Sequence, residues 1–368
     1  MNLKITKKQL IIYALLAIGF IGSIIFVHHN QFFYDRPIAK ITNTSDVDRT
    51  DISDQNDNKD YIVTQQIKAE IQNGAHKGET IDLTNEYAGS LAVDQAFNAG
   101  DEVFIAIDDE DFTGTIQDVK RDKYLVLVGW LFVIILIAVG KKQGALSVIS
   151  LAINAVIISL ALDIYLQNSD RSLIIICAIS IILFTVLSLL LVNGRNEKTY
   201  TAIIATLLGT LSSLVIAFLA LLVTGEEGLR YEEMSFLSRN PQLIFMAGLL
   251  IGSLGAVMDV AITMSSSIFE LYEKNKQISL KDLKKSGRDI GKDIMGTMIN
   301  VLFFAYVSGS IPMLLLYFKN ASPFGFTLSM NLSIELARAL AGGIGIVLTI
   351  PIAIYTSIFF IKRKKARS

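Results

Sequence analysis

The sequence predicts a membrane α-helical protein with eight transmembrane helices and a small β-rich domain between the first and second helices. Its 368 residues are 52% hydrophobic and have a mean hydropathy of +0.50, values that soluble domains rarely reach. Most apolar residues gather in runs of about 18 residues or more, the length that crosses a bilayer as a helix. One polar stretch, residues 28–123, follows the first run and indicates a domain outside the membrane.

The first apolar run, roughly residues 10–27, follows Lys4, Lys7 and Lys8. A basic start before an apolar run is also typical of a cleaved signal peptide. This run, however, is close to the length of a full span, and no convincing Ala-x-Ala cleavage site follows it. We therefore expect residues 1–27 to form an uncleaved N-terminal membrane anchor.

The polar stretch divides into two parts. The segment "TSDVDRTDISDQNDNKD" is acidic and nearly free of apolar residues, so we expect residues 28–58 to be a flexible linker. From residue 59 to 123, short alternating apolar runs are broken by Asn73-Gly74 and Lys77-Gly78, which are strand and hairpin signals. Residues 59–123 are therefore predicted to form a small extracellular sheet or barrel of about five strands.

The remaining residues, 124–368, are predicted to form a bundle of seven transmembrane helices. The first two of these helices are joined only by "KKQG", which indicates a tight helical hairpin. The apolar runs lie at roughly 124–140, 144–166, 172–192, 200–224, 243–266, 294–318 and 332–361.

The basic residues orient these helices. Cytoplasmic segments of membrane proteins carry more Lys and Arg than short translocated loops. With the N-terminus inside, every predicted inner segment is basic, including the loop at 267–292. The short outer loops hold only Arg171, Arg230, Arg239 and Lys319. We therefore expect both termini in the cytoplasm and residues 28–123 outside the cell.

An acidic residue in the sixth apolar run is the main indication of function. Asp259 lies in "GSLGAVMDVAITMSSSIFELYE", and a carboxylate in a span costs about 2.5–3.5 kcal/mol to insert. Such residues usually face a bundle interior or a water-filled cavity. Helical spacing places Gly252, Gly255, Asp259 and Thr263 on one stripe. Gly248 and Gly252 also form a Gly-x-x-x-Gly pair that permits close helix approach.

Two further runs carry similar stripes of small and polar residues. We expect the three helices to pack together, with Asp259 facing Asn300 and with an ion pair near the outer end of the last helix. The residues are Gly296 and Asn300 in the seventh run, and Glu335, Arg338, Gly342 and Gly345 in the eighth.

Each of these features also has a structural interpretation. Glycine stripes mostly serve tight helix packing, and an ion pair of Glu335 with Arg338 suits a structural contact as well as a gate. The residues leave open whether Asp259 titrates or only packs. The basic loop at 267–292 is either a short surface helix attracted to anionic lipid or a solvated loop.

The chain lacks the residues of a metal or cofactor enzyme. Cys177 is the single cysteine, and His28, His29 and His76 lie near or within the polar N-terminal third, so no zinc ligand set runs along the spans. The cluster "DDED" at 108–111 lacks the spacing of a calcium loop and is interpreted as a solvated turn. We expect no enzymatic activity, no cofactor, no metal and no nucleic-acid partner.

Three long stretches of the chain resemble one family. The segments "GLLIGSLGAVMDVAITMSSSIFEL", "SGRDIGKDIMGTMINVLFFAYVSGSIPMLLL" and "ELARALAGGIGIVLTIPIAI" strongly resemble the YibE/F family of bacterial membrane proteins, from about residue 60 to the C-terminus. The anchor and outer domain resemble the longer, YibE-like type of member. The resemblance implies a multi-pass protein of a Gram-positive plasma membrane, with a shorter YibE/F paralogue as a possible partner.

A weaker similarity bears on mechanism. In SecD/SecF and other RND-type transporters, a helix with a Gly-x-x-Val-Asp-like segment is followed by a loop and a helix that bears Thr or Asn. Here "GAVMD", "KSGRDIG" and "GTMIN" follow in the same order. The similarity implies that Asp259 relays protons beside Asn300. This chain departs from that pattern by two extra spans, a smaller outer domain and no paired Thr-Thr.

These observations give a leading functional hypothesis and two alternatives. The first is an ion- or proton-coupled transporter or export-accessory protein of unspecified substrate, in which Asp259 titrates and Glu335 with Arg338 forms an outer clamp. The second is a scaffold that assembles with a paralogous subunit through its glycine stripes. An intramembrane aspartyl protease needs two carboxylates that meet, and the sequence context of Asp163 is unsuitable for the second.

Overall fold

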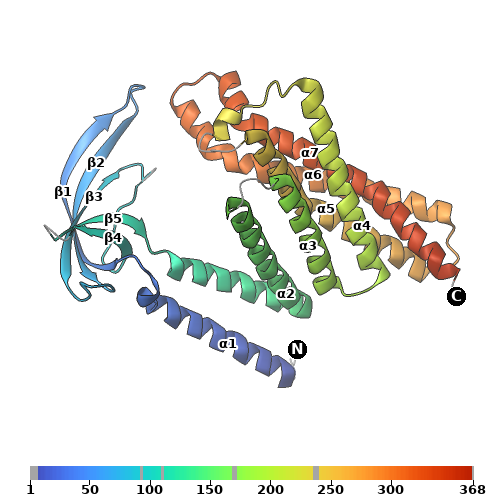
Figure 1. The fold of residues 1–368 in the computed structure, drawn as a ribbon, viewed down its shortest axis with the longest axis horizontal. Helices are drawn as coiled ribbons and strands as arrows, with labels where there is room; N and C mark the ends of the chain where they lie inside the picture. Colours follow the sequence, from blue (N-terminus) through green and yellow to red (C-terminus); the bar gives the residue numbers. More distant parts are fainter. Residues whose placement is uncertain (1–6, 92–93, 109–111, 168–171, 235–239, 367–368) are drawn as a thin grey trace, which may run out of the picture. The chain divides into compact units, whose positions relative to one another are not determined.

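The computed structural model describes residues 7–91, 94–108, 112–167, 172–234 and 240–366. It divides into two compact units, Met1–Ala138 and Val139–Ser368. The first unit holds a helix, a β-barrel and the start of a second helix, and the second unit is a helical bundle (Figure 1).

The first unit begins with α1 (Lys7–His28) and a short 3-10 helix, η1 (Gln31–Phe33). The next elements are five strands and the first part of α2. Their bounds are β1 (Ile38–Ser53), β2 (Lys59–Ile71), β3 (Thr80–Ala88), β4 (Glu102–Asp108), β5 (Thr113–Val119) and α2 (Asp122–Gln167).

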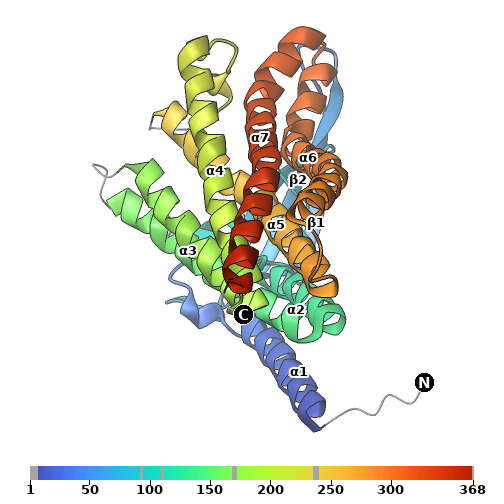
Figure 2. The ribbon, with the colours of Figure 1, turned by 90° about the vertical axis from the view of Figure 1, so that its right-hand side faces the viewer.

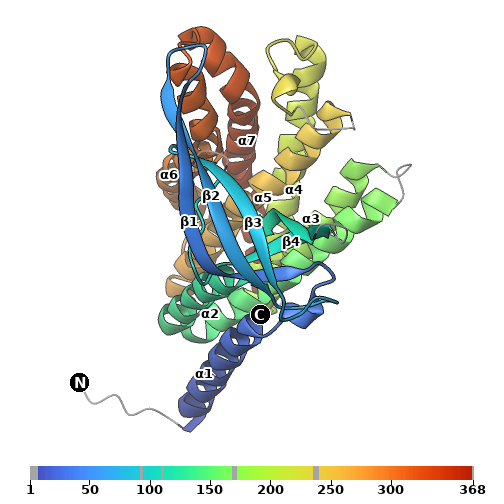
Figure 3. The same cartoon turned by 90° about the vertical axis from the view of Figure 1, so that its left-hand side faces the viewer.

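The strands form a closed barrel in the order β1-β2-β3-β5-β4. Figure 3 shows β1, β2 and β3 side by side. The barrel closes through antiparallel pairing of β1 with β4 and a single parallel pair, Leu83 with Gly114. Inward residues such as Ile41, Ile67 and Ile105 are buried in its core. The order is that of a five-stranded Greek-key barrel, the architecture of OB-folds, and the predicted β-rich character of this region is confirmed.

The prediction of a flexible linker at 28–58 has to be corrected, because strand β1 occupies residues 38–53. Its first residues are buried in the barrel, but from Asn43 onward its side chains are mostly exposed. This part pairs with β2 as far as Ser53 and Lys59. Only its tip, beyond Thr50 and Ile62, is a two-stranded arm, because β3 pairs with β2 up to Ile62. A strand whose two faces are exposed satisfies its backbone N–H and C=O groups by pairing with the neighbouring strand. It needs no alternation of apolar residues, so its composition does not reveal it.

A buried lysine joins the helices of the first unit to the barrel. The Lys120 side chain is 1% exposed, and its Nζ lies 2.9 Å from Glu102 Oε2. It also donates to Asp122 Oδ1 at 2.9 Å and to the Val27 carbonyl at the end of α1 at 2.8 Å. Asn30 Nδ2 donates to the second oxygen of Asp122. The end of α1, the start of β4, the end of β5 and the start of α2 therefore meet at one charge cluster.

The second unit contains the rest of α2 and five further helices. Figure 2 shows α7 between α4 and α6, and α7 also packs on α5. Asn154 Nδ2 on α2 donates to Ser188 Oγ on α3 at 2.9 Å. The bounds are α3 (Leu173–Asn193), α4 (Glu197–Thr224), η2 (Tyr231–Met234), α5 (Pro241–Lys274), α6 (Leu280–Lys319) and α7 (Phe324–Lys365).

The predicted membrane α-helical class is confirmed. Among the described residues, six helices, α2 to α7, are long and apolar enough to cross a membrane, and α1 contains a shorter apolar helix, Leu16–His28. The helix α2 runs from 122 to 167, but Lys141 within it has a non-helical φ of 49° and ψ of −123°. The backbone therefore leaves helical geometry at the predicted "KKQG" turn, inside α2.

The segment at 267–292 also differs from both expectations. The helix α5 continues to Lys274, and α6 begins at Leu280, so most of the segment is the regular extension of two long helices. The Ser279 hydroxyl caps α6 by accepting the Asp282 amide at 3.0 Å. Lys, Arg and Glu have helix propensities close to those of apolar residues. The change in hydropathy therefore shows where the apolar run ends, not where the helix ends.

Candidate functional site

The core of the second unit is a seam of small residues and hydroxyls between α4, α5 and α7. A Cβ on Gly342 would lie 2.5 Å from Leu302 Cδ2, and a Cβ on Gly345 would lie 3.1 Å from Ser213 Cβ. The buried Ser213 hydroxyl donates to the Ala341 carbonyl at 2.5 Å. The predicted packing positions Gly342 and Gly345 thus lie in close contact with neighbouring helices, where a larger side chain would force a neighbour to shift.

The helix α4 also contributes to this seam, which the charged residues of the sequence do not predict. Thr206, Gly209, Thr210 and Ser213 are buried on one face of α4, and a Cβ on Gly209 would collide with the Thr349 hydroxyl of α7. The signal was present, because these residues recur at helical spacing. This face of α4 carries no charged residue, so it differs little in sequence from an ordinary apolar span.

An ion pair lies at one end of the α5–α7 contact. Arg338 Nη1 donates to Glu335 Oε1 at 2.5 Å, as the spacing of the two residues predicts. Their side chains are only 17% and 20% exposed. The guanidinium lies 5.7 Å from the Phe245 ring centroid and within 3.6 Å of the position of a Cβ on Gly248. The arginine therefore covers the Gly248 position at ordinary van der Waals distance.

Tyr306 of α6 completes this cluster and was not predicted. A Cβ on Gly252 would collide with its hydroxyl, so Gly252 is the residue that lets Tyr306 reach α5. The Tyr306 hydroxyl and Arg338 Nε are both buried, and neither hydrogen-bonds another described residue. Buried polar atoms usually have hydrogen-bond partners. Water or another polar group beside this cluster would supply the partners that these two atoms lack. The signal in the sequence was a tyrosine in the middle of an apolar run.

Asp259 lies on a different side of α5 from the one expected. Its side chain is exposed, as are Gly255 and Thr263, and it forms no hydrogen bond or ion pair with a described residue. A Cβ on Gly255 would meet nothing within 4 Å. The physical reason is that α5 buries its larger apolar residues, including Val257 and Met264, against the bundle. The small polar stripe is left on the open face.

Asn300 is also exposed, and the expected contact between Asp259 and Asn300 does not form a hydrogen bond. The helix α6 packs on α7 through residues such as Leu302, which is buried. Asn300 stands two positions away and therefore faces roughly the opposite direction. Gly296 lies near Asn300, and a Cβ there would meet nothing within 4 Å. These two residues are therefore on the open face of α6.

The α5 stripe links the two groups of candidate residues. Gly248 and Gly252 are covered by Arg338 and Tyr306, whereas Asp259 follows about 10 Å farther along the helix axis at 1.5 Å per residue. One continuous line of small and polar positions thus runs from the partly buried ion pair to the exposed acid. An acid on such a face needs water or another polar group to solvate it.

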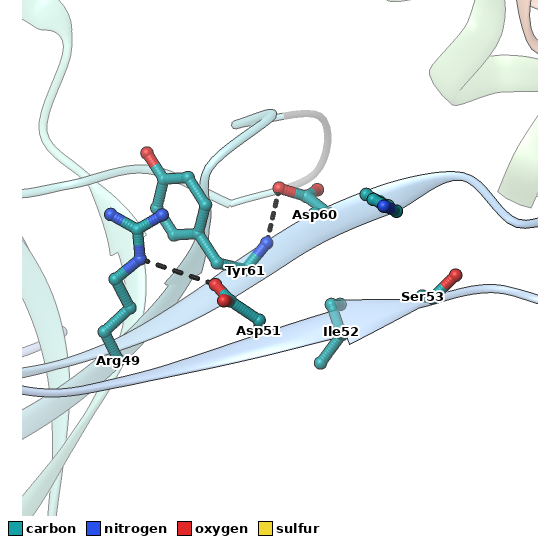
Figure 4. Close-up of a pocket in the computed structure, with 7 residues that line it drawn as sticks. Arg49, Asp51, Ile52, Ser53, Asp60 and Tyr61 are labelled. Carbon is teal, nitrogen blue, oxygen red and sulfur yellow. Dashed lines mark hydrogen bonds and ion pairs between the residues drawn. The ribbon is translucent and has the colours of Figure 1, made fainter.

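Two other regions, the "DDED" cluster and a cavity on the β1–β2 arm, offer weaker evidence for a functional site. Most of the "DDED" cluster lies outside the described residues, and the described ones contain no group of three His, Cys, Asp or Glu side chains that would hold a metal. A cavity of about 510 Å³ opens on the β1–β2 arm, where the Arg49 guanidinium lies 3.7 Å from the Tyr61 ring centroid (Figure 4). Arg49 and Asp51 are highly exposed, and such ion pairs contribute little.

Comparison with known families agrees with this architecture. Residues 128–363, most of the helical part, match the model described as YibE/F-like protein. Residues 32–119, which include all five strands, match the YibE/F family N-terminal domain. No curated protein and no solved structure matches the chain. The two matches cover most of the sequence in the expected order, and the chain belongs to the YibE/F family.

Proposed function

We propose that this protein is a bacterial plasma-membrane protein for ion- or proton-coupled transport, acting alone or as an export-accessory subunit. In this proposal the chain crosses the membrane eight times, through α1, the two parts of α2 on either side of Lys141, and α3 to α7. The basic inner segments support an orientation with both termini in the cytoplasm and residues 28–123 outside.

The observation that carries the proposal is the exposed Asp259 on the α5 stripe. No Lys or Arg occurs on α5 before its last residue, so the carboxylate has no cation of its own helix to neutralise it within the span. In this proposal the carboxylate takes up a proton from one side and releases it to the other, which is the chemistry of a relay. Thr263 and Asn300 supply neutral hydrogen-bonding groups on the open faces of α5 and α6.

The Glu335–Arg338 pair has the role of an outer clamp in this proposal. It is partly buried, it lies beside the unpaired Tyr306 hydroxyl, and it joins the line of small residues that leads to Asp259. Because the guanidinium is paired with the Glu335 carboxylate, the two side chains together carry no net charge. In this proposal the clamp therefore acts by occupying the outer end of the line rather than by repelling cations.

Proton flux across proteoliposomes tests this function. The full-length protein is reconstituted, a pH gradient is imposed, and a trapped pH-sensitive dye reports the flux. Asp259→Asn keeps the size of the side chain and removes the titration, so flux should fall about tenfold or more, the usual effect of losing a proton-transfer group.

The matched control is Asp163→Asn, which removes another exposed carboxylate near the end of α2. It should keep the flux of the unaltered protein. Equal flux from Asp259→Asn and Asp163→Asn would contradict the relay.

A second candidate function is assembly with a paralogous YibE/F subunit. It is favoured by the open space at Gly255 and Gly296, because small residues on exposed membrane helices are typical of helix–helix interfaces. Gly255→Leu should leave the fold of the chain intact and abolish co-purification with a tagged paralogue.

Gly252→Leu is the informative comparison for assembly, because its side chain would collide with Tyr306 inside the same chain. It should lower the thermal stability of the purified protein, whereas Gly255→Leu should not. Retention of the paralogue by a stable Gly255→Leu variant would rule out this interface.

A further inference from the structure

A groove lies between the start of α6 and the end of α7. The two helices run antiparallel and close together here, because a Cβ on Gly287 of α6 would lie 3.1 Å from Ile354 Cγ1 of α7. The groove has a volume of about 430 Å³. Its lining residues are Leu280, Lys281 and Lys284 from α6, and Tyr355, Ile358, Phe359 and Lys362 from α7.

The charged lining of the groove has one sign. Lys281, Lys284 and Lys362 come from two helices, and none of them forms an ion pair with a described carboxylate. Neighbouring lysines behave differently, since Lys274 pairs with Glu270 at 2.8 Å and Lys364 with Glu197 at 3.5 Å. The groove therefore gathers three uncompensated cations, a setting that favours an anion.

The rest of the lining is apolar and amphipathic. Phe359 is 61% exposed and Tyr355 is 53% exposed, although both stand on a helix that is long and apolar enough to span a membrane. Lys284 Nζ lies 4.6 Å from the Tyr355 ring centroid, so an ammonium and an aromatic face meet at one place. Aromatic residues beside lysines at a helix end are typical of the interface between headgroups and hydrocarbon.

We propose that this groove binds an anionic phospholipid. The three lysines contact the phosphate-bearing headgroup, and the acyl chains extend along Phe359 and the helix face toward the middle of the membrane. A free phosphate would satisfy the lysines but would leave the aromatic floor uncovered. A basic groove between transmembrane helices with an apolar floor fits the lipid better.

Native mass spectrometry of the full-length protein in detergent tests the proposal. The probes are dioleoyl phosphatidylglycerol, dioleoyl phosphatidylcholine and inorganic phosphate, each titrated separately. The unaltered protein should bind phosphatidylglycerol about a hundredfold more tightly than phosphatidylcholine, at about fivefold per lysine. Inorganic phosphate at the same concentration should not displace the lipid.

Three triple variants make the result specific. Lys281→Gln with Lys284→Gln and Lys362→Gln should bind the two lipids nearly equally, whereas the same three lysines changed to Arg should keep the preference. The control changes Lys276, Lys285 and Arg288 to Gln, which removes the same charge from outside the groove lining.

Loss of preference in the control as well as in the groove variant would show diffuse attraction and overturn the site. Displacement of the lipid by equimolar inorganic phosphate would assign the lysines to a free anion instead. An unchanged preference in the groove variant would also overturn the proposal, provided that size-exclusion chromatography shows each variant folded.

Discussion

At the scale of single residues, neighbouring positions on one helical stripe have different roles. Gly252 and Gly255 lie on the same side of α5, yet a Cβ would collide with Tyr306 at the first and meet nothing at the second. The sequence predicts the stripe because helical spacing fixes which residues share a face. It does not predict the difference, because a periodic pattern carries no information on which helix covers which turn.

Lys120 offers a residue-scale prediction for the first unit. Burial opposes its charge, but hydrogen bonds and charges from Asp122 and Glu102 outweigh burial and raise the pKa of Lys120. Lys120→Met leaves these two carboxylates uncompensated and should lower the free energy of unfolding by about 3 kcal/mol. Thermal unfolding of the full-length protein in detergent measures this, with the exposed Lys68→Met as control.

The pH dependence of the Lys120 effect follows from the direction of its shift. A lysine whose pKa is raised by folding stabilises fully below its unfolded value, near pH 10.4, and loses that contribution as pH rises through the folded value. The gap between Lys120→Met and the unaltered protein should therefore stay constant between about pH 7 and 9 and shrink above about pH 10.4. Equal unfolding temperatures for Lys120→Met and Lys68→Met would contradict a stabilising charge cluster.

At the scale of elements, the sequence predicts the helices that are marked by high hydropathy. It does not predict the elements whose order depends on pairing or packing with another element. The long apolar runs identify the membrane helices because only helices of that length satisfy their backbone in hydrocarbon. The polar strand β1 was assigned to a linker because its order comes from pairing with β2 rather than from its own composition. The charged start of α6, for which the sequence leaves a short surface helix or a solvated loop open, is ordered for the same reason, since its first turns pack on α7 through Gly287 and Gly291.

At the scale of the whole molecule, the chain forms two compact units with different structural features. The first unit holds a closed barrel joined to α1 and α2 by the Lys120 cluster, and the second holds the α4–α5–α7 seam and the open faces of α5 and α6. Family and fold class could be predicted from the sequence, as could the pairing of Glu335 with Arg338. The surroundings of Asp259 could not, because its exposure depends on how α5 packs against four other helices, α3, α4, α6 and α7.

A proton relay through Asp259 requires that water inside the membrane reach the open face of α5. The most direct measurement is the rate at which a hydrophilic maleimide labels single cysteines in native membranes. The background is Cys177→Ala, because Cys177 is buried in α3. Thr263→Cys reports the α5 stripe, and Leu340→Cys, at a position that is 71% exposed on apolar α7, reports a surface facing lipid.

Water favours the reactive thiolate and an apolar medium suppresses it, so Thr263→Cys should react about tenfold faster or more than Leu340→Cys. Asp259→Asn should not remove this difference, since accessibility precedes titration. Equally slow labelling at both positions would contradict the account, because it would place the α5 stripe in lipid or in a sealed contact, where Asp259 has no water from which to take a proton.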